Sequence, residues 1–222
     1  MTYQFVNNCQ FRAEDLDRIY TEAFGPDKTD GWFVEVGASN GQDHSNTALL
    51  ADAGWSGLYI EPVKVLAKQC RQRHESSRIV VLNMAVGTIN GLQPMWLIPG
   101  WGTATSNYKA ALAICEKPEV FLSTVKPLDW VLGYALADLW MEVPTGFELL
   151  VIDVDFGEID VLKGFDIGYW KPKLVIIELH EESQHPLSEE VRQFALPYFK
   201  AAGYEKIYTD HINTIFRSNP VQ

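Results

Sequence analysis

The sequence predicts a single α/β domain in which helices cover a mostly parallel sheet. Short apolar segments rich in β-branched residues alternate with segments whose apolar residues recur at helical spacing. Several apolar segments end in glycine or an acid, which is typical of strands that meet at the carboxyl edge of a parallel sheet. The last two strand segments, residues 204–208 and 213–217, are separated by too few residues to be parallel, so they predict an antiparallel edge. A chain of 222 residues, 47% of them hydrophobic, is long enough to bury a sizeable core.

Residues 1–30 predict an N-terminal helical segment, and residues 31–217 predict the α/β core. The first helix is expected over residues 11–24, because the apolar side chains there fall near one helical face. In the first half of the core we expect strands at residues 32–36, 58–62 and 78–86, and helices at residues 45–53 and 63–74. His74 ends a basic helix and is expected at the surface.

The second half of the core continues the alternation. We expect strands at residues 92–98, 120–125, 147–155 and 172–180, and helices at residues 128–140, 157–163 and 188–202. Residues 92–98 are expected to pair back as a hairpin. Residues 99–109 are small, polar and aromatic without a period, so they fit a substrate lid or, equally, a solvent loop in which Trp101 packs locally.

A glycine-rich turn after the first strand is the first candidate binding site. Glu35 precedes Gly37 and Gly41, a spacing that differs from the dinucleotide fingerprint with its three glycines against a pyrophosphate. A carboxylate at this point disfavours a phosphate but pairs with an ammonium group, as in the amino-acid moiety of S-adenosylmethionine. Ser39 and Asn40 continue the loop, where main-chain N–H groups can approach a ligand. The alternative is an ordinary chain reversal.

The next two strand ends supply further candidates. Glu61 lies twenty residues beyond Gly41, near the separation at which an acid accepts hydrogen bonds from a ribose diol. Its alternative is an exposed carboxylate before Pro62, which suits a first helical turn. Met84 and Ala85 would lie at the same edge of the sheet, where an adenine could rest, although methionine is more often a core residue.

Two later strands end in the candidate catalytic groups. Asp153 and Asp155 follow one buried strand, and Glu178 and His180 end the next, so chemistry is expected there. Chemistry on an acceptor hydroxyl needs a base, for which we expect Asp153 or His180. The same four side chains also suit Mg²⁺, whereas acids at strand ends are often helix caps or cofactor contacts. A surface histidine after a strand is the alternative for His180.

Composition limits the partners and the compartment. The net charge of −11 and the pI near 4.9 argue against binding to nucleic acid or an anionic membrane, so a small-molecule or glycan acceptor is expected. The three cysteines are far apart and form no Cys-x-x-Cys pair, which predicts a reducing, cytoplasmic location. No signal pattern and no membrane-spanning apolar run is expected. Whether the chain forms a homo-oligomer stays open.

Taken together, these motifs resemble the FkbM family of S-adenosylmethionine-dependent methyltransferases. The resemblance extends over about residues 31–180 and includes Phe-Val-Glu-Val-Gly-Ala-Ser-Asn-Gly, Ser-Asn-Thr, Gly-Trp-Ser-Gly-Leu-Tyr-Ile-Glu-Pro, Asn-Met-Ala-Val-Gly and the segment from Asp153 to Gly164. It implies a Rossmann-like class I methyltransferase fold, with seven strands in the order 3-2-1-4-5-7-6 and helices on both faces. It also implies O-methyl transfer to polyketide, sugar or polysaccharide hydroxyls.

For such a cofactor we assign roles to the candidates. We expect Glu35 on the cofactor amino group, Gly37 and Gly41 in the tight turn, Glu61 on the ribose, Met84 and Ala85 at the adenine, and Asp153 near the methionine or the acceptor. Asn46, in the Ser-Asn-Thr turn, contacts the cofactor or caps a helix.

One motif departs from the family pattern Asp-x-Glu-Gly-x-Glu, because Asp155 is shorter and the glycine, Gly157, has moved. That departure leaves the acceptor and the role of Asp155 open. Two other functions remain as alternatives: a non-catalytic cofactor-binding module, and an NAD-linked oxidoreductase, which Glu35 and the glycine spacing disfavour.

Overall fold

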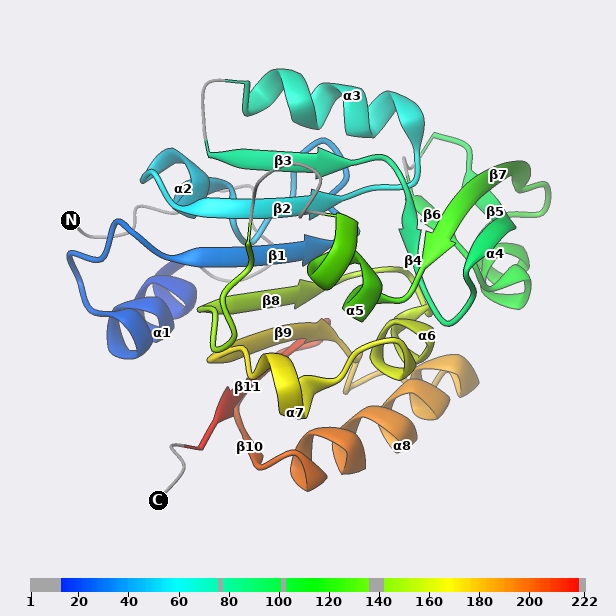
Figure 1. Cartoon of the computed structure of the whole chain (residues 1–222). Coiled ribbons are helices and arrows are strands. Elements are labelled where there is room, and N and C mark those ends of the chain that lie inside the picture. Colours follow the sequence, from blue (N-terminus) through cyan, green and yellow to red (C-terminus); the bar gives the residue numbers. More distant parts are fainter. Residues whose placement is uncertain (1–12, 76–77, 101–102, 136–141, 220–222) are drawn as a thin grey trace.

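The structure is a computed structural model that describes residues 13–75, 78–100, 103–135 and 142–219. A central sheet lies between two layers of helices, and a smaller second sheet lies beyond one end of its strands (Figure 1). The predicted α/β class with a mostly parallel sheet is confirmed.

The main sheet has seven strands in the spatial order β10-β11-β9-β8-β1-β2-β3. They are β1 (Trp32–Val36), β2 (Ser56–Ile60), β3 (Ile79–Leu82), β8 (Leu149–Ile152), β9 (Leu174–Glu178), β10 (Tyr204–Thr209) and β11 (Asn213–Ser218). Neighbours from β3 to β9 pair in parallel, whereas β11 is antiparallel to both β9 and β10. Numbered within this sheet alone, the order reads 3-2-1-4-5-7-6. We predicted that the antiparallel strand would lie at the edge of the sheet. In the structure the antiparallel strand, β11, lies between β9 and β10, so β10 is the edge strand.

The prediction of one sheet was incomplete, because the chain builds a second sheet after β3. Its order is β4-β7-β5-β6, with β4 (Ala85–Val86), β5 (Gly91–Ile98), β6 (Thr103–Thr105) and β7 (Glu119–Lys126). The strand predicted over residues 78–86 is split between the two sheets. Asn83 marks the break, since its side-chain amide donates to the carbonyl oxygens of Glu61 and Pro62, each at 2.9 Å.

The segment expected as a lid or solvent loop is partly regular. Its residues Thr103–Thr105 form β6, and α4 (Tyr108–Ile114) follows, capped by the side chain of Asn107. Residues 101 and 102 are not among the described residues, so the expectation that Trp101 packs locally falls outside them as well. The second sheet and α4 lie beyond the carboxyl ends of the parallel strands (Figure 1), so this segment borders the edge where ligands are expected.

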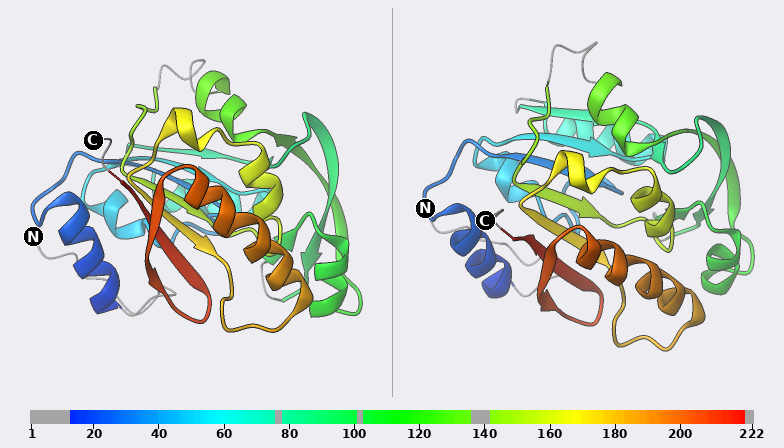
Figure 2. Two further views of the ribbon diagram at one scale, coloured as in Figure 1. Left: turned by 90° about the horizontal axis from the view of Figure 1, so that it is seen from below. Right: turned by 60° about the horizontal axis from the view of Figure 1, so that its bottom comes forward.

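Each face of the main sheet has its own layer of helices (Figure 2). Each layer packs on the sheet through its own apolar core. One core packs α1 (Ala13–Phe24), α2 (Ala48–Asp52) and α3 (Lys64–Arg73) on the sheet. The other packs α5 (Leu128–Trp130), α6 (Glu158–Lys163), α7 (Ile167–Trp170) and α8 (Pro186–Ala201). Strand alternation produces the two cores: in β1, Phe33 belongs to the first and Val34 and Val36 to the second.

Two predicted helices differ at their ends. After α5 the chain forms a π-helical turn, Val131–Ala135, and the rest of the helix predicted over residues 128–140 lies outside the described residues. The helix predicted over residues 11–24 begins at Ala13 in the described chain. Across the described residues, none of the helices combines the length and apolarity that crossing a bilayer requires.

Candidate active site

A cavity lies where β1, β2, β8 and β9 end, facing the start of the second sheet. Its volume is about 1030 Å³, which includes open solvent at the mouth. The main sheet supplies one wall, and Thr103, Ala104 and Ser106 supply the other. Parallel strands bring their carboxyl ends to this edge, so side chains far apart in sequence meet here.

The cavity wall is strongly acidic. The carboxyl residues that line it are Glu35, Asp43, Glu61, Asp153, Asp155 and Glu178, and among the described residues no lysine or arginine lines it. Their combined field favours a cationic ligand and repels phosphate.

Glu35 is held in the wall by the loop that precedes α2. Its side chain is 3% exposed, and its Oε2 accepts hydrogen bonds from Ser45 Oγ at 3.0 Å and from Thr47 Oγ1. Burial raises the pKa of Glu35 to about 7, against the opposing effect of these two hydroxyl groups. The carboxyl group is therefore fixed in position and ready to ionise when a positive charge arrives.

The side chain of Glu61 connects the loop after β1 with the loop after β2 through hydrogen bonds. Its Oε2 accepts from the backbone N–H of Ser39 at 2.9 Å, and its Oε1 accepts from that of Val63 at 2.7 Å. Burial raises the pKa of Glu61 to about 7 although both hydrogen bonds favour the charged form. Each carboxylate oxygen keeps a second lone pair, so Glu61 can still accept from a diol in the cavity.

Gly37 makes the tight turn that the motif predicts. Its φ is +89°, and a Cβ at this position would lie 1.6 Å from the carbonyl oxygen of Asp153. Only glycine lets the end of β1 approach the end of β8 this closely. Gly37 thereby brings Glu35 and Asp153 to the same cavity.

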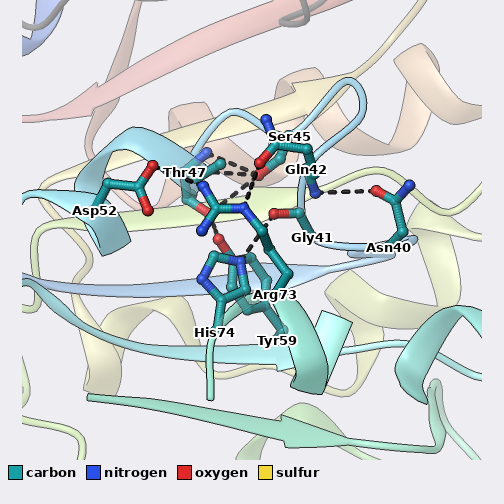
Figure 3. Close-up of polar contacts among 10 residues, drawn as sticks. Asn40, Gly41, Gln42, Ser45, Thr47, Asp52, Tyr59, Arg73 and His74 are labelled. Atoms are coloured by element: carbon teal, nitrogen blue, oxygen red, sulfur yellow. Dashed lines mark hydrogen bonds and ion pairs between the residues drawn. The ribbon is translucent and has the colours of Figure 1, made fainter. Parts of the chain in front are cut away.

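Gly41 is not part of the cavity lining, and its polar contact is drawn in Figure 3. A Cβ on it would lie 2.6 Å from Cys70 Sγ, and its carbonyl oxygen lies 2.9 Å from His74 Nε2. His74 is 4% exposed, so its predicted surface position was wrong. Its ring lies 4.8 Å from that of Tyr59, and burial lowers the pKa of His74, which favours a neutral ring that donates to Gly41.

The same loop is anchored by other polar contacts in Figure 3. Arg73 donates to Gln42 and, at 2.7 Å, to Asp52. Asn40 Oδ1 accepts from the backbone N–H groups of Gln42 and Asp43. The last turn of α3 and the side chain of Asn40 thus fix the shape of the loop.

The structure separates the predicted cofactor residues into two groups. Glu35, Gly37, Ser39, Glu61, Met84, Ala85 and Asp153 line the cavity, whereas Asn40, Gly41 and Asn46 lie outside its lining. The carbonyl oxygen of Asn46 accepts from the Tyr20 hydroxyl at 2.9 Å, and its side-chain Oδ1 is buried without a hydrogen bond to any described residue. Asn40, Gly41 and Asn46 therefore shape the binding loop.

Several carboxyl groups lie close together at the ends of β8 and β9. Asp153, Asp155 and Glu178 line it, and Glu158 lies behind them with its Oε1 accepting from the backbone N–H of Val154 at 3.2 Å. Burial raises the pKa of Glu158 to about 7. Burial and then the neighbouring negative charges raise the pKa values of Asp155 and Glu178 well above normal, and Glu178 shares a hydrogen bond with Asp153. Burial and mutual repulsion therefore disfavour the simultaneous ionisation of these carboxyl groups.

His180 lies beside this cluster and not in the cavity lining. Its Nε2 is 3.5 Å from Glu178 Oε2, and its ring stacks on Phe156 with centroids 5.6 Å apart. Burial, and after it the charges of Arg192 and His211, lowers the pKa of His180. The position of His180 suits orientation of Glu178 better than contact with a substrate.

The metal site considered for Asp153, Asp155, Glu178 and His180 finds no support. Within the described parts of the chain, no group of three or more histidine, cysteine or acidic side chains is arranged to hold a metal ion.

Sequence analysis missed several residues of the wall. Asp43, His44 and Ser45 lie between the glycine turn and α2, and Met95 comes from β5. His44 is exposed at the cavity and has a φ of +61°, which is uncommon for a residue with a side chain. Its place directly after the glycine turn was the available signal, whereas Met95 gave none.

Comparison with solved structures gives matches at low sequence identity. The crystal structure of WbdD gives a TM-score of 0.50 at 12% identity, and the match covers 93% of this chain and 40% of that one. A ribosomal protein L11 methylase from Lactobacillus delbrueckii subsp. bulgaricus gives 0.43 at 12% identity, covering 93% and 79%. The fibrillarin/Nop5p complex gives 0.47 at 13% identity, covering 86% and 74%. A comparison with curated proteins gives no match.

The family comparison is more specific than these structural likenesses. The methyltransferase FkbM domain matches residues 35–206, from Glu35 at the end of β1 into β10, and so includes every strand end that borders the cavity. The chain is therefore a member of the FkbM methyltransferase family.

Proposed function

We propose that this protein is an S-adenosylmethionine-dependent O-methyltransferase that acts on a hydroxyl of a sugar, polysaccharide or natural product. The observation that carries the proposal is the cavity lined by six carboxyl residues and, among the described residues, by no lysine or arginine. S-adenosylmethionine carries an ammonium and a sulfonium group, whereas NAD carries two phosphates, so the charge of the cavity favours the former.

The residues present fit this cofactor. Glu35 would accept from its amino group, Glu61 from the ribose diol, and Met84 and Ala85 would border the adenine. The raised pKa values of Glu35 and Glu61 agree with a site built to receive positive charge, since a cation restores the ionised form of both. When bound, S-adenosylmethionine supplies a methyl group activated by the sulfonium.

The acidic cluster supplies the base. A hydroxyl acceptor must lose its proton as it is methylated, and Asp153, Asp155 and Glu178 are the carboxyl groups of β8 and β9 that line the cavity. We assign proton acceptance to Asp153, which shares a hydrogen bond with Glu178, and assign His180 to holding Glu178 in place. The role of His180 thereby changes from base to positioning residue.

Calorimetric titration with S-adenosylmethionine and with NAD tests the cofactor. The wild-type protein should bind the former alone, and Glu35→Gln should weaken binding by about 1.5 to 3 kcal/mol, the scale of a charge-assisted hydrogen bond. Glu148→Gln is the matched control, because Glu148 is 8% exposed but pairs with Lys28 and Lys173 away from the cavity lining. Equal losses in the two variants would remove Glu35 from the site.

Transfer of a radiolabelled methyl group to a panel of hydroxyl compounds tests the reaction. Asp153→Asn should abolish transfer while leaving cofactor binding measurable. Cofactor binding without transfer to any compound of a broad panel would favour the alternative of a non-catalytic binding module. Binding of NAD alone would exclude the methyltransferase assignment for this site.

A further inference from the structure

A second cavity lies next to the acidic one. It is bounded by β5, the start of α4, α6 and α8, and its volume is about 1180 Å³ including open solvent at the mouth. Ser106 lines both cavities, so they are neighbours.

The turn between β8 and α6 separates the two compartments. Asp155 lines the acidic cavity and Phe156, the next residue, lines the second one. Both have left-handed backbones, with φ of +51° and +69°, a costly arrangement for two consecutive residues with side chains. Thr105 Oγ1 donates to the carbonyl oxygen of Asp155 at 2.6 Å, so β6 of the second sheet holds the turn in this conformation.

Aromatic rings border the second cavity. Trp96 and Tyr108 have ring centroids 5.1 Å apart, and Tyr108 is 50% exposed although it is large and partly apolar. Phe156 completes the set and is supported from behind by the rings of His180 and His185. An exposed aromatic face carries partial negative charge and packs well against the C–H groups of a ligand.

The charges of the second cavity differ from those of the first. Asp160 and Glu190 are balanced there by Lys109 and Lys163. A ligand here meets hydrogen-bond donors and acceptors in similar number without a net field. Aromatic faces combined with such a balanced polar rim suit a neutral ring that has many hydroxyl groups and one apolar face.

We infer that the second cavity is the acceptor subsite and that it binds a neutral pyranose unit of the acceptor. The sugar ring stacks on Tyr108 and Trp96, and a hydroxyl reaches past Ser106 into the acidic cavity, where Asp153 accepts its proton. The inference deepens the proposed function and rests on it for the reaction, but the sugar-binding claim is testable separately.

Saturation-transfer NMR with methyl α-glucopyranoside, methyl α-mannopyranoside, methyl α-galactopyranoside and methyl α-rhamnopyranoside tests the subsite. At least one glycoside should receive saturation from the wild-type protein. Tyr108→Ala should weaken its binding by about tenfold, the scale of one aromatic contact, while Tyr108→Phe keeps most of it. Tyr169→Ala is the matched control: Tyr169 is 60% exposed and lies 5.1 Å from a tryptophan ring, but it borders neither cavity.

The outcomes distinguish the inference from the proposed function. Glycoside binding that Tyr108→Ala removes and Tyr169→Ala leaves intact supports the subsite, even if S-adenosylmethionine does not bind. No signal from any glycoside, or equal signals from the two alanine variants, overturns it, even if S-adenosylmethionine binds normally. Binding of planar methyl 4-hydroxybenzoate with no glycoside binding would also overturn the saccharide assignment. Because Tyr108 is exposed, its substitution should leave folding intact, which thermal unfolding will verify.

Discussion

Substitution of Gly37 by alanine tests how the first strand meets the fourth strand of the main sheet. The added Cβ would lie 1.6 Å from the carbonyl oxygen of Asp153, which belongs to the backbone and cannot rotate away. Relief of this overlap requires the end of β1 to move away from the end of β8. That movement would weaken the hydrogen bonds from Asp153 N to Val36 O, at 3.0 Å, and from Gly37 N to Ile60 O, at 2.9 Å.

The expected cost has two parts. A left-handed conformation costs an alanine about 1 to 2 kcal/mol. Each of the two weakened backbone hydrogen bonds contributes about 1 kcal/mol more. The Gly37→Ala protein should therefore lose about 3 to 4 kcal/mol of unfolding free energy, and because Asp153 is displaced, its affinity for S-adenosylmethionine should fall as well.

Gly25→Ala is the matched control, measured with Gly37→Ala by urea denaturation and by calorimetry with the cofactor. Gly25 has almost the same φ, +88°, but no other described residue has an atom within 4 Å of its Cβ position. The control should lose only the conformational part, about 1 to 2 kcal/mol, and should bind the cofactor normally. If the two variants lose equal stability, the close approach of β1 and β8 is not what requires glycine at residue 37.

Three other predictions concern buried groups. His74→Ala removes the hydrogen bond to Gly41 and the ring contact with Tyr59, so urea denaturation should show a loss of about 2 to 3 kcal/mol in the free energy of unfolding. An unchanged denaturation midpoint would show that the glycine loop does not depend on His74 for its stability. Burial raises the pKa of Glu35 from 4.5 to about 7, so the unfolded chain loses this proton first and the unfolding free energy of the ligand-free protein should fall between those pH values. Urea denaturation at a series of pH values should show a flatter decline for Glu35→Gln, and parallel curves would contradict the assignment. Burial raises the pKa of Cys70 to about 12, so iodoacetamide should label the half-buried Cys115 before Cys70 in the native protein. Peptide mass mapping gives the order of labelling, and the reverse order would contradict the buried position of Cys70.

Short stretches of sequence were enough to predict the strands and helices whose apolar residues follow a regular spacing. The parallel strands are continuous apolar runs because both of their faces are covered, and their lengths and ends are visible in the chain. The acids Glu35, Glu61 and Asp153 were predicted at one site because the carboxyl ends of parallel strands must share one edge, and all three line the cavity.

Contacts between residues far apart in the sequence determine two features that the local patterns did not predict, the second sheet and the burial of His74. The second sheet depends on pairing between β5 and β7, which are separated by residues with no common period. His74 is buried because its helix packs over the glycine loop, whereas its basic neighbours indicated a surface position.

The sequence by itself determined the class of the fold, the edge of the sheet that carries the site and the sign of its charge, because each follows from residues adjacent in the chain. Only the tertiary structure decided that His180 lies behind Glu178 and that Asp155 and Phe156 face different compartments. The physical reason is that side-chain direction at a turn depends on backbone angles and on the elements packed against it. For Asp155 that partner is Thr105, fifty residues earlier in the chain.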